Sequence, residues 1–156
     1  MSEESGNREF HRKIAVECFN RAWDYLEKKD RTIRDDQLML HLAHTSRYHW
    51  SFVGSPRNLA VGDWQISRVY AALNQPALSL HFAKTSLEIG EKNNLPEVVL
   101  TANEAMARAY ACDKKYQLAK EFLHKAKTQL QTASLDEDDR KVYADQIDET
   151  ERMILG

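Results

Sequence analysis

The pattern of apolar and polar positions is helical almost from residue 8 to the C-terminal end of the chain. Pro56, Pro76 and Pro96 lie 20 residues apart, each where a first helical turn tolerates a missing backbone N–H. Each proline therefore predicts the start of a helix. We predict seven helices with short connections and no strand, over residues 8–29, 34–53, 57–74, 76–92, 97–113, 115–132 and 135–154.

Side chains that cap helices refine two of these starts. Ser134 is followed three residues later by Glu137, which predicts a capping box for the last helix, and Thr32 with Asp35 is a weaker example at the second helix. Residues 1–7 carry Gly, Ser and Glu and are predicted to be a disordered tail.

The proline spacing suggests a 40-residue unit that contains two helices. Residues of similar type recur at that separation, although the match is imperfect. The matched pairs are Ile66 with Met106, Ser67 with Ala107, Arg68 with Arg108, Tyr70 with Tyr110, and Ser79 with Ala119.

These residues carry a resemblance to a known family. The segment MARAYACDKKYQLAKEFLHKA, residues 106–126, resembles a tetratricopeptide unit, with Ala107, Tyr110, Tyr116, Ala119 and Ala126 at the signature places. Residues 61–89 resemble a second unit through Ile66, Ser67, Tyr70, Ser79, Ser86 and Leu87. That unit lacks the usual glycine and aromatic residue at its turn, so we expect an atypical turn there. The stretches AHTSRYHW and GDWQISRVYA also resemble bacterial proteins of unassigned role, which implies no activity.

The resemblance implies an all-α fold, a right-handed superhelix of antiparallel helix pairs. We expect a single tetratricopeptide-like domain over residues 1–156. Within it, residues 8–53 form an atypical N-terminal pair, residues 57–132 form two repeat units, and residues 135–154 form a capping helix.

The resemblance also implies a concave peptide-binding groove lined by Trp64, Arg68, Thr101, Glu104 and Arg108, with Ala71 and Cys112 nearby. Trp64 and Arg68 are four residues apart and therefore share a helix face. In one interpretation the two arginines receive carboxylates and an exposed Trp64 stacks on the ligand. In the other, Trp64 packs against the preceding helix and the arginines pair with Glu104 or other acids.

A possible ligand site lies on the second helix, where His44, Arg47, His49 and Trp50 are close in sequence. In the alternative function, this helix and the start of the third helix, with Trp64 and Arg68, form a site for a small molecule or a metal ion. The helical wheel turns His49 toward the core and places His44 and Arg47 on the opposite side. A buried His49 needs a partner, either Ser46 one turn back or a group on a neighbouring helix.

The more specific catalytic and metal-binding motifs in this sequence are each missing a residue that the chemistry requires. His41 with His44 has no marked third ligand, Ser46 with His49 has no orienting acid, and Glu121-x-x-His124 occurs once where a di-metal bundle needs two. No glycine-rich phosphate loop is present. We predict no catalytic residue, no metal and no cofactor, and a non-enzymatic module that binds a protein or peptide.

Charge and composition narrow the partners further. A net charge of -2 and a pI near 6.3 disfavour nucleic acid, and no apolar run is long enough to span a membrane. The polar N-terminal segment is unlike a signal peptide, so we expect a cytoplasmic protein with Cys18 and Cys112 as reduced thiols. The C-terminal helix either caps the array or docks a second copy in a homodimer through Val142, Tyr143, Ile147, Met153 and Ile154.

Overall fold

The computed structural model describes residues 3–156 and shows seven helices and no strand within them, which confirms the predicted all-helical class. None of these helices is long and apolar enough to cross a bilayer. The helices are α1 (Glu3–Glu27), α2 (Ile33–Val53), α3 (Pro56–Ala72), α4 (Pro76–Lys92), α5 (Pro96–Cys112), α6 (Tyr116–Thr132) and α7 (Glu137–Leu155).

The starts of α3, α4 and α5 agree with the proline signals, whereas α1 and α7 begin at residues other than those predicted. Pro56, Pro76 and Pro96 each occupy a first-turn position, as predicted. α1 begins at Glu3, so the chain is helical over most of the predicted disordered tail. The first two residues lie outside the described part of the chain, and the prediction for them is not tested.

Capping by side chains is confirmed at α2 and corrected at α7. Thr32 Oγ1 accepts the Asp35 N–H at 3.1 Å, and the Asp35 carboxylate accepts the Thr32 N–H at 3.0 Å. The predicted capping box at Ser134 is wrong because Asp136 caps α7 and accepts the Asp139 N–H at 2.8 Å. A carboxylate next to the first helical residue is favoured by the free N–H groups and the helix dipole.

Three turns with the same geometry connect α3 to α6. Asn74, Asn94 and Lys114 lie 20 residues apart and have φ angles of 57°, 52° and 60°, in the left-handed region. At the first turn Gln75 N–H donates to the Tyr70 carbonyl at 2.8 Å, and the other two turns repeat this bond. The turn after α3 therefore has the same geometry as the other two, since asparagine adopts this conformation more readily than most residues.

Lys114 is the residue least suited to its turn, and replacing it with glycine is expected to stabilise the protein. A lysine at positive φ carries a steric cost that glycine does not, and the Lys114 side chain is exposed. We expect Lys114→Gly to raise the free energy of unfolding by about 0.5–1 kcal/mol in urea denaturation. Asn74→Gly is the control and should gain less, so an equal or larger gain there contradicts this explanation.

Small side chains allow close packing within the helix pairs. Ser67, Ser79, Ser86, Ala107, Ala119 and Ala126 are all buried, at matching places of the two 40-residue units. Ser67 Oγ donates to the Ser79 carbonyl at 2.8 Å, and Ser79 Oγ donates to the Ser67 carbonyl at 2.9 Å. These reciprocal bonds satisfy both hydroxyls, so serine replaces alanine in the first unit without an unpaired polar group.

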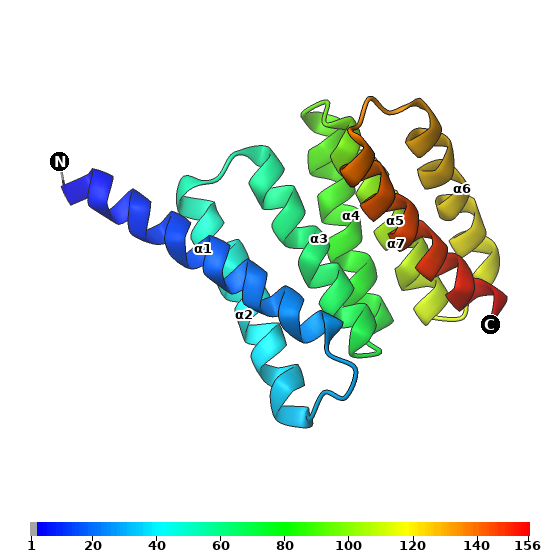
Figure 1. Cartoon of the computed structure of the whole chain (residues 1–156), viewed down its shortest axis with the longest axis horizontal. Helices are drawn as coiled ribbons and strands as arrows, with labels where there is room; N and C mark the ends of the chain where they lie inside the picture. The colour runs from blue at the N-terminus through cyan, green and yellow to red at the C-terminus, as the bar shows by residue number, and fades with distance from the viewer. Residues whose placement is uncertain (1–2) are drawn as a thin grey trace.

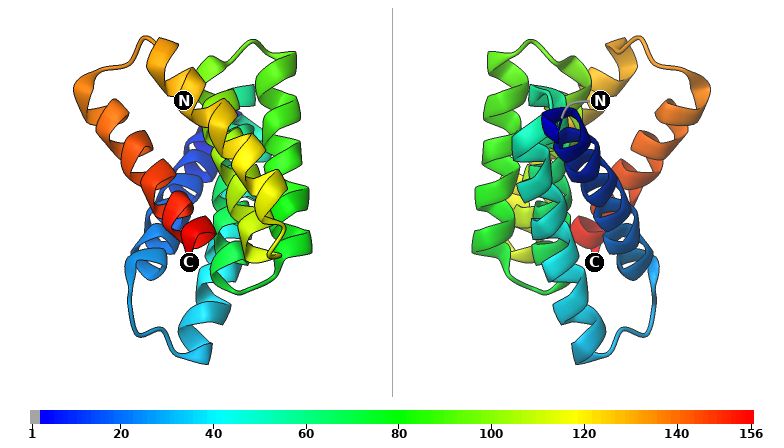
Figure 2. Two further views of the ribbon diagram at one scale, coloured as in Figure 1. Left: turned by 90° about the vertical axis from the view of Figure 1, so that its right-hand side faces the viewer. Right: turned by 90° about the vertical axis from the view of Figure 1, so that its left-hand side faces the viewer.

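The helices form a row in which each packs on the next (Figure 1). Beyond these neighbours, the backbone of α3 lies close to those of α1 and α5, and that of α5 lies close to α7. The backbones of α2, α4 and α6 are farther from one another, and α2 meets α4 through the rings of His44 and Phe82, whose centroids are 5.6 Å apart. Figure 2 shows α1 and α7 on the same side of the layer that α3 to α6 form. One face of α3 and α5 is thus flanked by α1 and α7.

Candidate functional site: the groove between α1 and α7

Three adjacent hollows follow the face of α3 between α1 and α7, and together we call them the groove. Their volumes are about 240, 90 and 420 Å³. Arg57 and Val61 line both of the first two hollows, and the stacked rings of Trp64 and Trp23 connect the second to the third. The groove is lined, among others, by Val16, Phe19, Trp23, Arg57, Val61, Trp64, Arg68, Thr101, Val142, Tyr143 and Glu149.

Two tryptophans form the floor of the groove. The rings of Trp23 on α1 and Trp64 on α3 are stacked, with centroids 5.6 Å apart and an interplanar angle of 24°. Trp64 is 8% exposed, so it is not the exposed anchor of the first interpretation. Its packing resembles the second interpretation, except that its stacking partner comes from α1 instead of the preceding helix α2. The buried Trp64 Nε1 has no hydrogen-bond partner.

Arg68 lies beside these rings and is only partly neutralised. Its guanidinium carbon is 5.2 Å from the Trp23 ring centroid and 5.6 Å from that of Trp64. Its Nη2 is 3.7 Å from Glu149 Oε2, and its Nη1 is 4.0 Å from Glu104 Oε1. Both Nε and Nη1 are buried without a hydrogen-bond partner.

The electrostatics of Arg68 follow from this placement. Burial, and next to it the positive charge of Arg108, lower the pKa of Arg68 to about 10, against the opposing effect of Glu104 and Glu149. The side chain is still protonated at neutral pH. The floor of the groove therefore holds a buried cation with unused hydrogen-bond donors.

Glu104 and Arg108 are brought to the same cluster but lie beneath α7. Arg108 donates from Nε and Nη2 to Glu104 Oε1, at 3.1 and 2.8 Å, and its Nη1 is 3.4 Å from Glu149 Oε1. Thr150 also donates to Glu104. Glu104 is 1% exposed and Arg108 is 6% exposed. Arg108 is thus paired internally, as the second interpretation expected. Of the three predicted groove residues on α5, only the partly exposed Thr101 lines the groove.

The four residues of the second predicted site do not converge. His44 Nε2 is 2.9 Å from the Tyr70 hydroxyl, and Arg47 Nε is 2.9 Å from Asp63 Oδ1, both toward α3. His49 and Trp50 instead face α1. The reason is that α2 packs between α1 and α3, so its two sides are both partly buried.

His49 has its partner on a neighbouring helix, the second of the two possibilities considered from the sequence, and does not pair with Ser46. Its Nδ1 is 2.9 Å from His11 Nδ1, while Ser46 Oγ donates to the Ala15 carbonyl at 2.7 Å. The guanidinium of Arg12 lies over the Trp50 ring at 5.6 Å from its centroid. Within residues 3–156 no three His, Cys, Asp or Glu side chains are grouped so that they could hold a metal ion. Cys18 and Cys112 are partly buried free thiols.

The two partly buried imidazoles of α2 predict a pH-dependent stability. Burial, followed by the charge of a neighbouring histidine, lowers the pKa of both His44 and His49. Because the unfolded chain then binds protons more readily, the free energy of unfolding falls as pH drops from the unfolded value near 6.5 through the folded pKa.

Chemical denaturation at about pH 7.5 and about pH 5.5 measures this loss. His44→Gln should keep a hydrogen-bonding group near Tyr70 and reduce the loss. His124→Gln, at an exposed position of α6, is the matched control. A loss that is unchanged in His44→Gln would show that other groups cause it.

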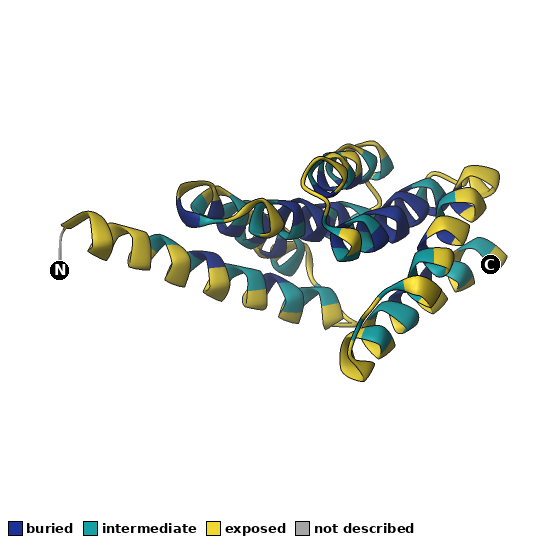
Figure 3. Ribbon diagram, turned by 90° about the horizontal axis from the view of Figure 1, so that it is seen from above, coloured by how far each residue is buried: buried dark blue, intermediate teal, exposed yellow. Residues whose placement is uncertain are grey.

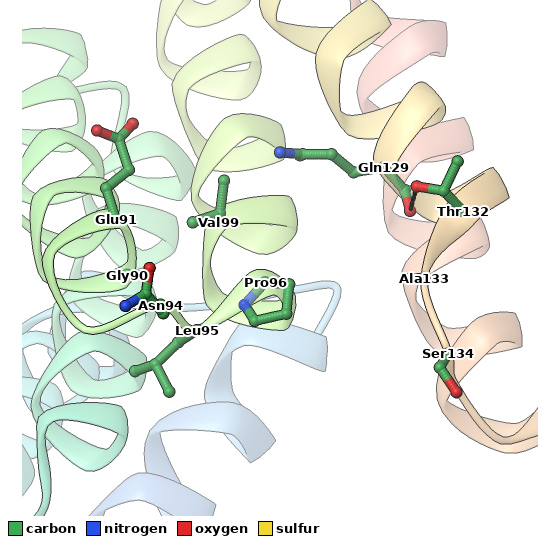
Figure 4. Close-up of a pocket in the computed structure, with 10 residues that line it drawn as sticks. All are labelled: Gly90, Glu91, Asn94, Leu95, Pro96, Val99, Gln129, Thr132, Ala133 and Ser134. Carbon is green, nitrogen blue, oxygen red and sulfur yellow. Dashed lines mark hydrogen bonds between the residues drawn. The ribbon is translucent and has the colours of Figure 1, made fainter.

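A further hollow of about 600 Å³ lies outside the groove, between the α4–α5 turn and the C-terminal end of α6 (Figure 4). Its lining is mostly apolar or neutral, and Glu91 is the one charged residue that contributes to it. None of the site residues predicted from sequence lies there. We therefore treat the groove as the better candidate site.

Comparison with protein-family models, with curated proteins and with solved structures finds no match to this chain. The candidate site therefore depends on its own geometry. Sequence reasoning missed Trp23 and Glu149, the residues that α1 and α7 contribute to the groove. An aromatic residue on the first helix and an acid on the last carried no spacing signal relative to Arg68.

Proposed function

We propose that the chain is a non-enzymatic interaction module that holds a segment of a partner protein, or a peptide, in the groove. The observation that carries this proposal is Arg68. A guanidinium that is nine-tenths buried, with two nitrogens lacking hydrogen bonds, is costly unless something compensates it. A carboxylate of the bound segment that approaches Nη2, the nitrogen that Glu149 faces, would add to the compensation of this charge.

A tetratricopeptide-like right-handed superhelix is the architecture that we propose for the array. Three features support it. The turns recur every 20 residues, the small buried positions recur at 40, and the odd-numbered helices contact one another along one face. In such an array the odd-numbered helices line the concave surface, where extended partners bind.

Glu149 occupies the place that we assign to the carboxylate of the ligand. It comes from α7, its side chain is 51% exposed, and it approaches Arg68 at 3.7 Å without the short contact of a good ion pair. An exposed acid at this distance can be displaced at small cost. We propose that a ligand carboxylate replaces Glu149 at Arg68 while apolar side chains of the ligand cover Val16, Val61 and Val142.

Selection from a phage-displayed library of random peptides tests this function. Wild-type protein should enrich peptides that place an acidic residue next to apolar or aromatic residues, and these peptides should compete with one another. The same selection on Arg68→Met should lose the acidic preference. Arg34→Met, at an exposed position on α2, is the matched control. No enrichment with wild type, or an acidic preference retained in Arg68→Met, would refute the proposal.

A further inference from the structure

We propose that a second copy of this chain docks antiparallel on the outer face of α1, across a two-fold axis near the level of residue 8. The surface concerned, which we call the N-terminal face, consists of Glu3, Gly6, Phe10 and Lys13 on α1 with Tyr48 and Phe52 on α2. It lies outside the groove, and the inference does not depend on the function proposed there.

Exposed aromatic rings gather at this end of the molecule. Phe10, Tyr48 and Phe52 are 56%, 62% and 48% exposed. Two histidines link these rings. The ring centroids of Phe10 and His49 are 6.2 Å apart, and Phe52 stacks on His11 with centroids 4.2 Å apart. Tyr48 meets Phe52 edge-on at 5.1 Å. Gathered large aromatic side chains that stay exposed are typical of an interaction surface.

The first turns of α1 extend past the end of α2. Figures 1 and 3 show this part of α1 running beyond the other helices, and every described residue before His11 is exposed. A helical end that stays largely exposed gains little stability from burial. Contact with another chain would bury part of this exposed end.

The charged, small and large side chains on this face of α1 would match one another if two copies of the helix packed antiparallel. Glu3, Gly6, Phe10 and Lys13 are spaced by three, four and three residues, so they share one face. In an antiparallel pair centred at the level of residue 8, Glu3 of one copy faces Lys13 of the other. Phe10 then faces Gly6. A two-fold interface requires this kind of reciprocal match.

Gly6 gives a separate reason to expect a close neighbour. Glycine inside a helix costs about 1 kcal/mol relative to alanine. Within the described residues 3–156, a Cβ placed on Gly6 would meet no atom within 4 Å beyond its chain neighbours and the adjacent backbone of its own helix, so the fold gives no reason for glycine there. The ring of Phe10 from a second copy, lying on the helix backbone, would give one.

The C-terminal helix is the other surface considered for a second copy, and two of the five residues predicted for that contact are packed inside the molecule. Ile147 is 2% exposed and belongs to a core cluster with Ala107, Leu123 and Ala126, and Ile154 packs against that cluster. Val142 lines the groove. Of the larger apolar residues of α7, Leu155 is the most exposed, at 76%.

Sedimentation equilibrium of the full chain, from about 1 to 500 µM, tests the proposal because this range covers the micromolar affinities expected when one helix and a few aromatic side chains form an interface. Wild type should be in monomer–dimer equilibrium. Phe10→Glu, Glu3→Lys and Lys13→Glu should each weaken the dimer, Phe10→Glu by at least about tenfold. The double variant Glu3→Lys/Lys13→Glu should restore it, since each charge meets its opposite again. Circular dichroism of every variant confirms the fold.

Leu155→Lys is the control for the C-terminal helix and should leave the dimer unchanged. A wild type that is monomeric up to the highest concentration overturns the proposal. So does a dimer that Leu155→Lys disrupts and Phe10→Glu does not. Failure of the double charge reversal to restore the dimer overturns it as well.

Discussion

Replacing Glu104 with glutamine is expected to lower the free energy of unfolding by about 3–5 kcal/mol, the cost of leaving a buried charge unpaired. Glu104 is 1% exposed and lies between Arg108, at 2.8 Å, and Arg68, at 4.0 Å. Without its charge the two guanidiniums repel each other in a buried site that only the half-exposed Glu149 still compensates. The hydrogen bond from Thr150 also loses its charged acceptor.

Urea denaturation of Glu104→Gln against wild type measures this effect. Glu97→Gln is the matched control, because Glu97 forms an ion pair with Arg57 at 3.3 Å in which both side chains are well exposed. Such surface pairs contribute at most about 1 kcal/mol. Equal effects of the two substitutions would mean that the buried cluster does not hold α3, α5 and α7 together.

Two substitutions at the floor of the groove are expected to change ligand affinity in opposite directions. Arg68→Met should weaken a peptide selected on wild type by about 30-fold or more, equivalent to roughly 2 kcal/mol for a charge-assisted contact. Glu149→Gln should strengthen the same peptide because the internal carboxylate no longer competes for Arg68.

Fluorescence anisotropy of the labelled peptide measures both affinities, and circular dichroism checks that each variant folds. Arg34→Met should leave the affinity unchanged. If Glu149→Gln weakens the peptide as Arg68→Met does, Glu149 contributes to the binding surface and our account of displacement is wrong.

The helices of this protein are predictable because their signals are local. Proline at a first helical turn and the Thr32–Asp35 capping box depend on neighbouring residues, and both agree with the structure. The predicted cap of α7 is wrong because Ser134 and Asp136 both carry a side-chain oxygen near the start of the helix, and the sequence spacing favoured Ser134. Arg140 binds the Ala133 carbonyl at 2.7 Å in the α6–α7 connection, while Asp136 caps the helix.

The candidate site was less predictable because contacts between distant helices decide it. The 40-residue match placed Arg68 and Arg108 at equivalent positions, and they do meet in one cluster. Their environments differ because α7 covers Arg108, whereas Arg68 stays at the border of the groove. The helical wheel of α2 does separate His49 from His44, but it does not show that α1 packs on one of these sides and α3 on the other.

Mapping of a selected peptide on ¹⁵N-labelled protein by NMR tests most directly the claim that the groove is the binding site. We predict shifts of the indole N–H signals of Trp23 and Trp64 and of the backbone amides of Val61, Thr101 and Val142. The Trp64 indole is a sensitive reporter because its Nε1 has no hydrogen-bond partner. Shifts confined to Tyr48 and Phe52, or to the hollow beside Gly90, with the groove signals unmoved, would contradict the account.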